Sequence, residues 1–237
     1  MEQKYPIIVS KEVYQKLPGV MLITGVAKVN SENIKQEAVK EYLNSSWKSL
    51  QAKVADETSV EFKQIQQWCD TLKVSGISVK DYPPSIKAIS KRALKGGEVF
   101  SINPIVDAYN AISMDLALPF GAYDKAELVG SLQIRLSSGN EDFIGLGSEK
   151  NESTESGEIV FADERSILTR MFLWRQSGKC KITSQTTEFV FICEVAGVMG
   201  LETAKRAQEY IEQKLIYLLG AEIVNMQIQT ESNLNSI

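Results

Sequence analysis

The stretch INPIVDAYNAISMDLALPFGAYD, residues 102–124, carries the clearest structural signal in this sequence. Asn103 is a preferred helix cap and Pro104 suits a first helical turn, so a helix is predicted to begin here. Apolar residues at helical spacing continue it: Ile105, Tyr109, Ile112 and Leu116. They predict a face that packs on the protein core. A corner at Pro119, Phe120 and Gly121 is predicted to end the segment.

The same helix carries a second, polar stripe. Asn103, Asp107 and Asn110 are spaced i, i+4 and i+7, which places them on one face, and Ser113 follows. One interpretation is structural: Asn103 caps the helix, and the Asp107 carboxylate complements the positive helix N-terminus. The other is that the stripe lines a ligand pocket. Both interpretations stay open, and Asn110 and Ser113 have no capping role of their own.

The rest of the chain predicts an α+β fold. Helical periodicity covers residues 32–54, 57–73, 86–95 and 203–219. Apolar runs predict strands at residues 20–29, 131–137, 143–147, 158–162, 166–174, 188–197 and 222–229. The run 188–197 is apolar almost throughout, which is typical of a central strand. Residues 148–157 are predicted to form a surface loop and residues 230–237 a loose tail.

Strands in the middle of the chain and helices toward both ends favour one α+β domain over residues 1–237. Within it we distinguish a helical N-terminal part at about 30–75 and a C-terminal helix and strand at about 203–229.

Composition excludes several kinds of chemistry. The sequence contains no histidine, which rules out Ser–His and Cys–His dyads and histidine-ligated metals. Cys69, Cys180 and Cys193 lie far apart without a Cys-x-x-Cys pair, so neither a disulfide framework nor a zinc site is predicted. We therefore expect no metal, no other cofactor and a cytoplasmic location. The first residues lack the apolar core of a signal peptide, and no apolar run is long enough to span a membrane.

Three ordered motifs connect the chain with a known family. They are residues 102–124, GEIVFADE at residues 157–164, and WRQSGKCKITSQTTEFVFICE at residues 174–194. In this order they resemble the B3/B4 editing domain of the phenylalanyl-tRNA synthetase beta subunit. The matching positions are Asn103, Pro104, Val106, Asp107, Asn110, Pro119, Ala122, Tyr123, Asp124, Thr186, Thr187 and Glu194. YPPSIKAISKRALKGG at residues 82–97 and the WRQS segment resemble freestanding members of the family, and the likeness covers about residues 60–196.

The resemblance implies a fold and a function. The fold would be a central, mostly antiparallel and barrel-like β structure flanked by helices. The function would be hydrolysis of a wrong amino acid, chiefly tyrosine, from tRNA, here acting in trans. The implied binding residues for the amino acid are Asn103, Asp107, Asn110, Ser113, Pro119, Gly121 and Arg175. The aminoacylation module of the synthetase is not recognised in this sequence, so the chain is not expected to charge tRNA.

Two departures from the family pattern affect the expected pocket. The synthetase reads Pro-Leu-His-Ala-Phe-Asp where this chain reads PFGAYD, so Gly121 stands in place of a histidine. Trp174 and Arg175 stand near a Gly-Gly pair of the synthetase. Because both changes alter the shape of the pocket, tyrosine specificity is not carried over.

Glu194 is the main catalytic candidate. It is the only charged residue between Phe189 and Leu201, and a buried carboxylate needs a partner or its pKa rises. An ionised Glu194 could hold the α-ammonium group of an esterified amino acid, whereas a raised pKa would suit proton transfer. The alternative is a structural ion pair with Arg175 or Arg135. Backbone N–H groups near Gly121 or Gly178 could stabilise the developing oxyanion.

A basic helix is the candidate RNA contact. The net charge of −4 does not favour nucleic acid, but Lys87, Lys91, Arg92 and Lys95 come without an intervening acid. The three lysines are spaced i, i+4 and i+8, which predicts a ridge for tRNA phosphates or, alternatively, a solvated helix face.

Three functions remain possible from the sequence. The first is an aminoacyl-tRNA deacylase with aminoacylated tRNA as substrate and no DNA or membrane partner. The second is a non-catalytic module that binds amino acids or tRNA, which the missing histidine favours. The third is a protein-interaction domain that has drifted from its ancestor.

Overall fold

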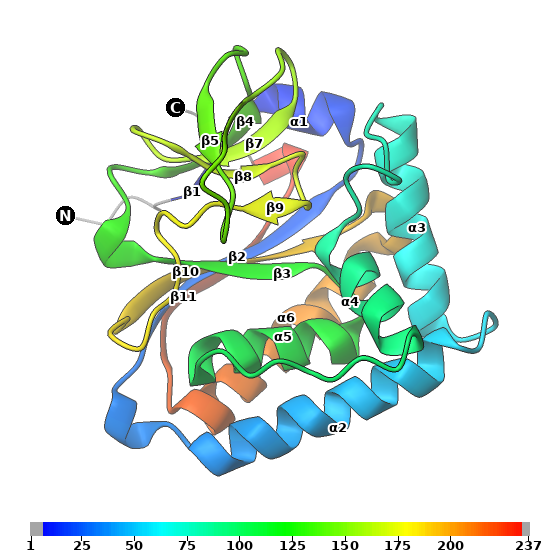
Figure 1. Cartoon of the computed structure of the whole chain (residues 1–237), viewed down its shortest axis with the longest axis vertical. Helices are drawn as coiled ribbons and strands as arrows, with labels where there is room; N and C mark the ends of the chain where they lie inside the picture. Colours follow the sequence, from blue (N-terminus) through cyan, green and yellow to red (C-terminus); the bar gives the residue numbers. More distant parts are fainter. Residues whose placement is uncertain (1–6, 234–237) are drawn as a thin grey trace.

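The computed structural model describes residues 7–233, shown in Figure 1. Residues 1–6 and 234–237 lie outside the described part, and with them half of the predicted tail. Two main sheets face each other, and helices cover the outer side of one of them. The predicted α+β class is therefore confirmed. The described strands form open sheets and do not close into a barrel.

The four-stranded sheet has the order β11-β2-β10-β3. Its strands are β2 (Met21–Lys28), β3 (Phe120–Asp124), β10 (Glu188–Val195) and β11 (Glu222–Gln229). β10 pairs antiparallel with both β2 and β3, and seven of its eight residues are buried. This confirms the central position predicted from its apolar run. The predicted corner at Pro119 to Gly121 is instead the start of strand β3, because β10 offers it a partner along five residues.

Helices α2 (Gln36–Val54), α5 (Pro104–Leu116) and α6 (Gly200–Leu219) lie on one face of this sheet. α5 and α6 pack on the strands, and α2 packs on α5. The apolar stripe predicted for α5 explains why this helix packs on the sheet, because its residues Ile105 and Ile112 are almost fully buried. α6 ends at Gly220, whose left-handed conformation closes the helix.

The opposite face of the four-stranded sheet meets the five-stranded sheet β1-β4-β7-β8-β9. Its strands are β1 (Ile7–Val9), β4 (Leu132–Leu136), β7 (Ile159–Ala162), β8 (Ile167–Arg170) and β9 (Arg175–Gln176), and helix α1 (Lys11–Lys16) follows β1. The predicted hairpin of β7 and β8 is present. Its second strand ends at Arg170, earlier than predicted, because Met171 and Phe172 adopt positive φ angles of 50° and 62°.

Two further features complete the described part. β5 (Asp142–Ile144) pairs with β6 (Asn151–Ser153), so a short strand interrupts the predicted loop 148–157. α3 (Val60–Val74) and α4 (Ser85–Leu94) stand at one edge of the two sheets. None of the helices within residues 7–233 has the length and hydropathy needed to cross a membrane.

Candidate active site

A cavity of about 100 Å³ lies where the two main sheets meet. Strands β3 and β10 supply one wall at alternating positions, because side chains of a strand point to one face at every second residue. The residues of this wall are Pro119, Gly121, Tyr123, Ile192 and Glu194. The opposite wall consists of Phe161, Thr169, Phe172, Leu173, Trp174, Arg175 and Gln176, and Ser85 of α4 and Phe120 also line the cavity.

Glu194 lies in this cavity with 5% of its surface exposed. Within residues 7–233 its carboxylate forms no ion pair: Arg135 binds Glu141, and Arg175 lies 3.9 Å from Glu152. Burial therefore raises the pKa of Glu194 well above its ordinary value of 4.5, opposed only by a hydrogen bond from its own backbone amide. The structural ion pair considered above is not present in the described part.

The cavity also offers hydroxyl, guanidinium and amide groups. The Tyr123 hydroxyl lies 2.6 Å from Oγ1 of Thr169, and burial raises the pKa of Tyr123. Arg175 has a side chain that is 36% exposed, and Nε2 of Gln176 donates to the carbonyl of Ala122 at 3.3 Å. A ligand would thus meet one carboxyl group inside and a cation at the more open side.

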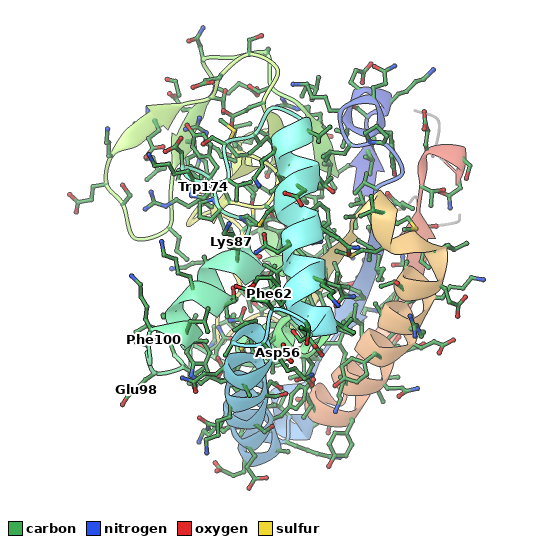
Figure 2. All side chains as sticks on the ribbon, turned by 90° about the vertical axis from the view of Figure 1, so that its right-hand side faces the viewer. Asp56, Phe62, Lys87, Glu98, Phe100 and Trp174 are labelled. Carbon is green, nitrogen blue, oxygen red and sulfur yellow. The ribbon has the colours of Figure 1, made fainter. Side chains whose placement is uncertain are left out.

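The YPPS and WRQS segments form one side of the cavity together. The rings of Tyr82 and Trp174 meet edge to face at 4.9 Å, and the backbone amide of Ser85 donates to the carbonyl of Leu173 at 2.9 Å. These contacts place the N-terminus of α4 at the cavity. Trp174 is labelled in Figure 2, above the start of α4.

The polar stripe of α5 does not line this cavity. Oδ1 of Asn103 accepts from the backbone amide of Val106 at 3.0 Å, which is the predicted cap. Asp107 accepts from the amide of Ile102 at 2.8 Å, and the buried Ser113 hydroxyl donates to the carbonyl of Leu118.

Asn103, Asp107 and Ser113 are therefore not among the residues that line the cavity of Glu194, because local turns use their polar groups. Asn110 is half-buried, and its part in ligand binding stays a prediction. Gly178 lines a separate depression beside Cys180 and Lys181, away from Glu194.

The four basic residues divide into two groups. Lys87, Lys91 and Lys95 line a groove beside α3. Arg92 lies apart from them, with its guanidinium carbon 5.1 Å from the ring centre of Trp47 and 4.6 Å from that of Phe100. Arg92 is thus a packing residue between aromatic rings, whereas the predicted ridge consists of the lysines.

Several cavity residues escaped sequence reasoning. Tyr123 and Trp174 belong to recognised motifs, but their side chains were not assigned to the site. Side chains of a strand share a face at every second residue. Counting in twos from Glu194 to Ile192, and from Pro119 to Tyr123, predicts part of the cavity wall. Thr169 and Phe172 carry no sequence signal, because sheet packing alone brings them to the cavity. No group of three or more Cys, Asp or Glu side chains within residues 7–233 is arranged to hold a metal ion.

Comparison with known proteins places the chain in a family. Residues 67–213 match the model of the B3/4 domain, which is more than half of the chain. This chain belongs to the B3/4 domain family. The B3/4 match includes every cavity residue named above.

Relatives of this B3/4 domain occur inside a longer protein. The phenylalanine–tRNA ligase beta subunit of Photorhabdus laumondii is 29% identical over 138 residues, covering 58% of this chain and 16% of that subunit. The same subunit of Colwellia psychrerythraea is 33% identical over 113 residues, which cover 46% of this chain and 13% of that subunit. The matches thus span between about an eighth and a sixth of the length of these relatives.

A solved structure shares the fold. It is an N-terminal fragment of the phenylalanyl-tRNA synthetase beta subunit from Pyrococcus horikoshii, with a TM-score of 0.50 at 9% identity. The match covers 96% of this chain and 55% of that fragment. At this identity the likeness establishes the fold alone.

The raised pKa of Glu194 predicts a pH dependence of stability. A carboxyl group with a raised pKa in the folded state contributes stability that is fully present below its unfolded pKa and is lost as pH rises through the folded pKa. Above pH 4.5, the wild-type free energy of unfolding should therefore fall relative to that of Glu194→Gln, by at most about 1.4 kcal/mol per pH unit. Urea unfolding at pH 5 and pH 8 measures this difference; parallel pH profiles would show that Glu194 ionises freely in the folded protein.

Proposed function

We propose that this B3/4 domain is a cytoplasmic deacylase that hydrolyses the ester of mischarged aminoacyl-tRNA in trans. One observation carries the proposal: Glu194 is buried, has no ion-pair partner within residues 7–233 and lines a cavity. Perturbed carboxyl groups in cavities favour function over structure, since a buried unpaired carboxyl group costs stability. The relation to phenylalanine–tRNA ligase subunits supports a tRNA ester as the substrate.

The reaction requires a positioned water and a group that takes its proton. The water oxygen attacks the ester carbonyl carbon and gives a proton to Glu194, the bond from that carbon to the ribose oxygen breaks, and Glu194 passes the same proton to the leaving ribose oxygen. Glu194 acts in its ionised form, and the raised pKa makes that carboxylate a stronger base for the proton of water. The Arg175 guanidinium binds the polar end of the substrate at the more exposed side of the cavity.

A screen of mischarged tRNAs tests the activity directly. Each tRNA carrying a labelled non-cognate amino acid is incubated with the full chain, and release of the free amino acid is measured. We expect release for a small subset of amino acids, because the cavity holds only about 100 Å³. The absence of release across the whole set, with a folded protein, would overturn the proposal.

Gly121 supports a second candidate, a non-catalytic binding module, because it replaces the histidine of the synthetase motif. The two functions separate in one measurement. A binding module would be stabilised against heat by free amino acids or uncharged tRNA but would release nothing from mischarged tRNA.

Gly121 also provides a test of the cavity as the binding site. A Cβ atom added at Gly121 would meet no atom within 4 Å, so Gly121→Ala should fold normally, and Gly121→Leu should place its longer side chain in the cavity. Because the added side chain would fill space that the substrate needs, we expect about a tenfold loss of kcat/KM for deacylation, equivalent to about 1.4 kcal/mol. Gly121→Ala is the matched control with a smaller loss. Equal rates for Gly121→Leu and the wild type would place the substrate elsewhere.

A further inference from the structure

A groove of about 360 Å³ lies between α3 and α4, separate from the cavity. Its floor is mainly apolar and includes the half-buried ring of Phe62 and the side chain of Leu94, which is 51% exposed. Gln66 also lines the groove with a half-buried side chain. We call this depression the α3–α4 groove. It combines an aromatic ring with an amide side chain.

Lys87, Lys91 and Lys95 line the groove from α4 and its C-cap. Their spacing of four residues extends them over about 12 Å along the helix. None of them forms an ion pair with a carboxylate of residues 7–233. Lys53 and Glu61, whose neighbours Val54 and Phe62 line the groove, pair with each other at 2.7 Å, and no carboxylate in the described part of the chain lines the groove itself.

Helix α4 connects this groove to the cavity. Ser85, the first residue of α4, lines the cavity, and Lys95 lies about 15 Å further along. Figure 2 shows Trp174, Lys87 and Phe62 following one another down the same face of the molecule. A chain-like ligand with one end in the cavity would therefore pass along the lysines to the groove.

We propose that the α3–α4 groove holds an unpaired nucleotide of the RNA strand whose end enters the cavity; this rests on the proposed function. The base stacks on Phe62 and forms hydrogen bonds with Gln66, as unpaired bases do on aromatic and amide side chains. The lysines bind the adjacent phosphates. An acidic peptide could use the same lysines, but it would need neither an aromatic ring nor an amide in the floor.

The first experiment measures the charge contribution. Binding of a fluorescent, uncharged single-stranded RNA ending in CCA is measured by anisotropy over a series of salt concentrations. Replacing Lys87, Lys91 and Lys95 with Gln should weaken binding and reduce the slope of log Kd against log salt by about 2. Lys205→Gln, an exposed residue of α6, is the matched control and should change neither. Unchanged binding in the triple variant would overturn the proposal.

The second experiment separates RNA from an acidic peptide. Phe62→Leu keeps an apolar side chain but removes the aromatic face, so RNA affinity should fall about tenfold with an unchanged salt slope. Phe62→Trp should retain affinity, and thermal unfolding checks both folds. Equal RNA affinity for wild type and Phe62→Leu, or a preference for an acidic Glu/Leu peptide or for blunt duplex RNA, would overturn the proposal.

These measurements are independent of hydrolysis, because the RNA carries no amino acid. RNA binding that depends on Phe62 and the lysines supports the groove even if no mischarged tRNA is hydrolysed. Conversely, suppose that the protein hydrolyses mischarged tRNA but that its RNA binding does not depend on Phe62 or the lysines. The proposed active site would then stand, and the proposal for the α3–α4 groove would be wrong.

Discussion

Replacing Glu194 with Gln is expected to lower the rate of deacylation at least tenfold. Loss of a general base typically lowers a rate by roughly 10²–10⁴-fold. Gln has nearly the same shape but cannot accept a proton from water. Because Glu194 has no ion-pair partner within the described residues, the change leaves no opposite charge unpaired, and the fold should persist. Single-turnover hydrolysis of a mischarged tRNA, with circular dichroism of each variant, provides the measurement.

The matched control for Glu194→Gln is Glu188→Gln. Glu188 lies on the same strand, β10, but pairs with Lys125 at 2.8 Å and does not line the cavity. Its variant should keep the wild-type rate. A folded Glu194→Gln protein with an undiminished rate would exclude proton transfer by Glu194. A change confined to KM would instead assign Glu194 to binding the ammonium group of the substrate.

Replacing Arg170 with Leu is expected to reduce the free energy of unfolding by about 3–5 kcal/mol. Nε and Nη2 of Arg170 donate to the two carboxylate oxygens of Glu158 at 2.8 and 2.7 Å, and the two side chains are 6% and 2% exposed. Removing the guanidinium leaves the Glu158 carboxylate buried without its main partner. Arg170 follows the cavity residue Thr169 on β8, so deacylation should decline as well. Urea unfolding at constant pH measures the loss.

Two further variants test the cause of this loss. The double variant Arg170→Leu with Glu158→Leu should recover most of the stability, because no buried charge then lacks a partner. Arg135→Leu removes a more exposed pair with Glu141, whose side chains are 28% and 26% exposed, and should cost about 1 kcal/mol or less. A double variant as unstable as Arg170→Leu alone would show that packing, including the contact of Arg170 with Phe143, dominates.

Most helices and strands were predictable because their signals are local. The cap and apolar stripe of α5 appear at the expected residues, α6 covers the predicted helix 203–219, and the apolar run of β10 is central in its sheet. Among the elements that were not predicted, which include β1, α1 and β9, strands β3 and β6 have sequences that resemble a corner and a loop. Each becomes a strand only because a partner lies beside it.

The candidate site was predictable only in part. Glu194, Gly121 and Arg175 were named from the sequence, and the structure brings them to one cavity; their roles stay predictions. Asn103, Asp107 and Ser113 were named on equally good spacing, yet their polar atoms bind nearby backbone groups. Helical spacing shows which residues share a face, but it does not show what that face meets.

The sequence by itself determined the α+β class, the order of most elements and the embedding of one carboxyl group in an apolar strand, since these depend on neighbouring residues. Only the tertiary structure decided that Thr169 and Phe172 face Glu194 across two sheets, and that α4 connects the cavity to the α3–α4 groove. Such contacts join residues that are distant in the chain, and their free energy comes from the packing of whole sheets and helices.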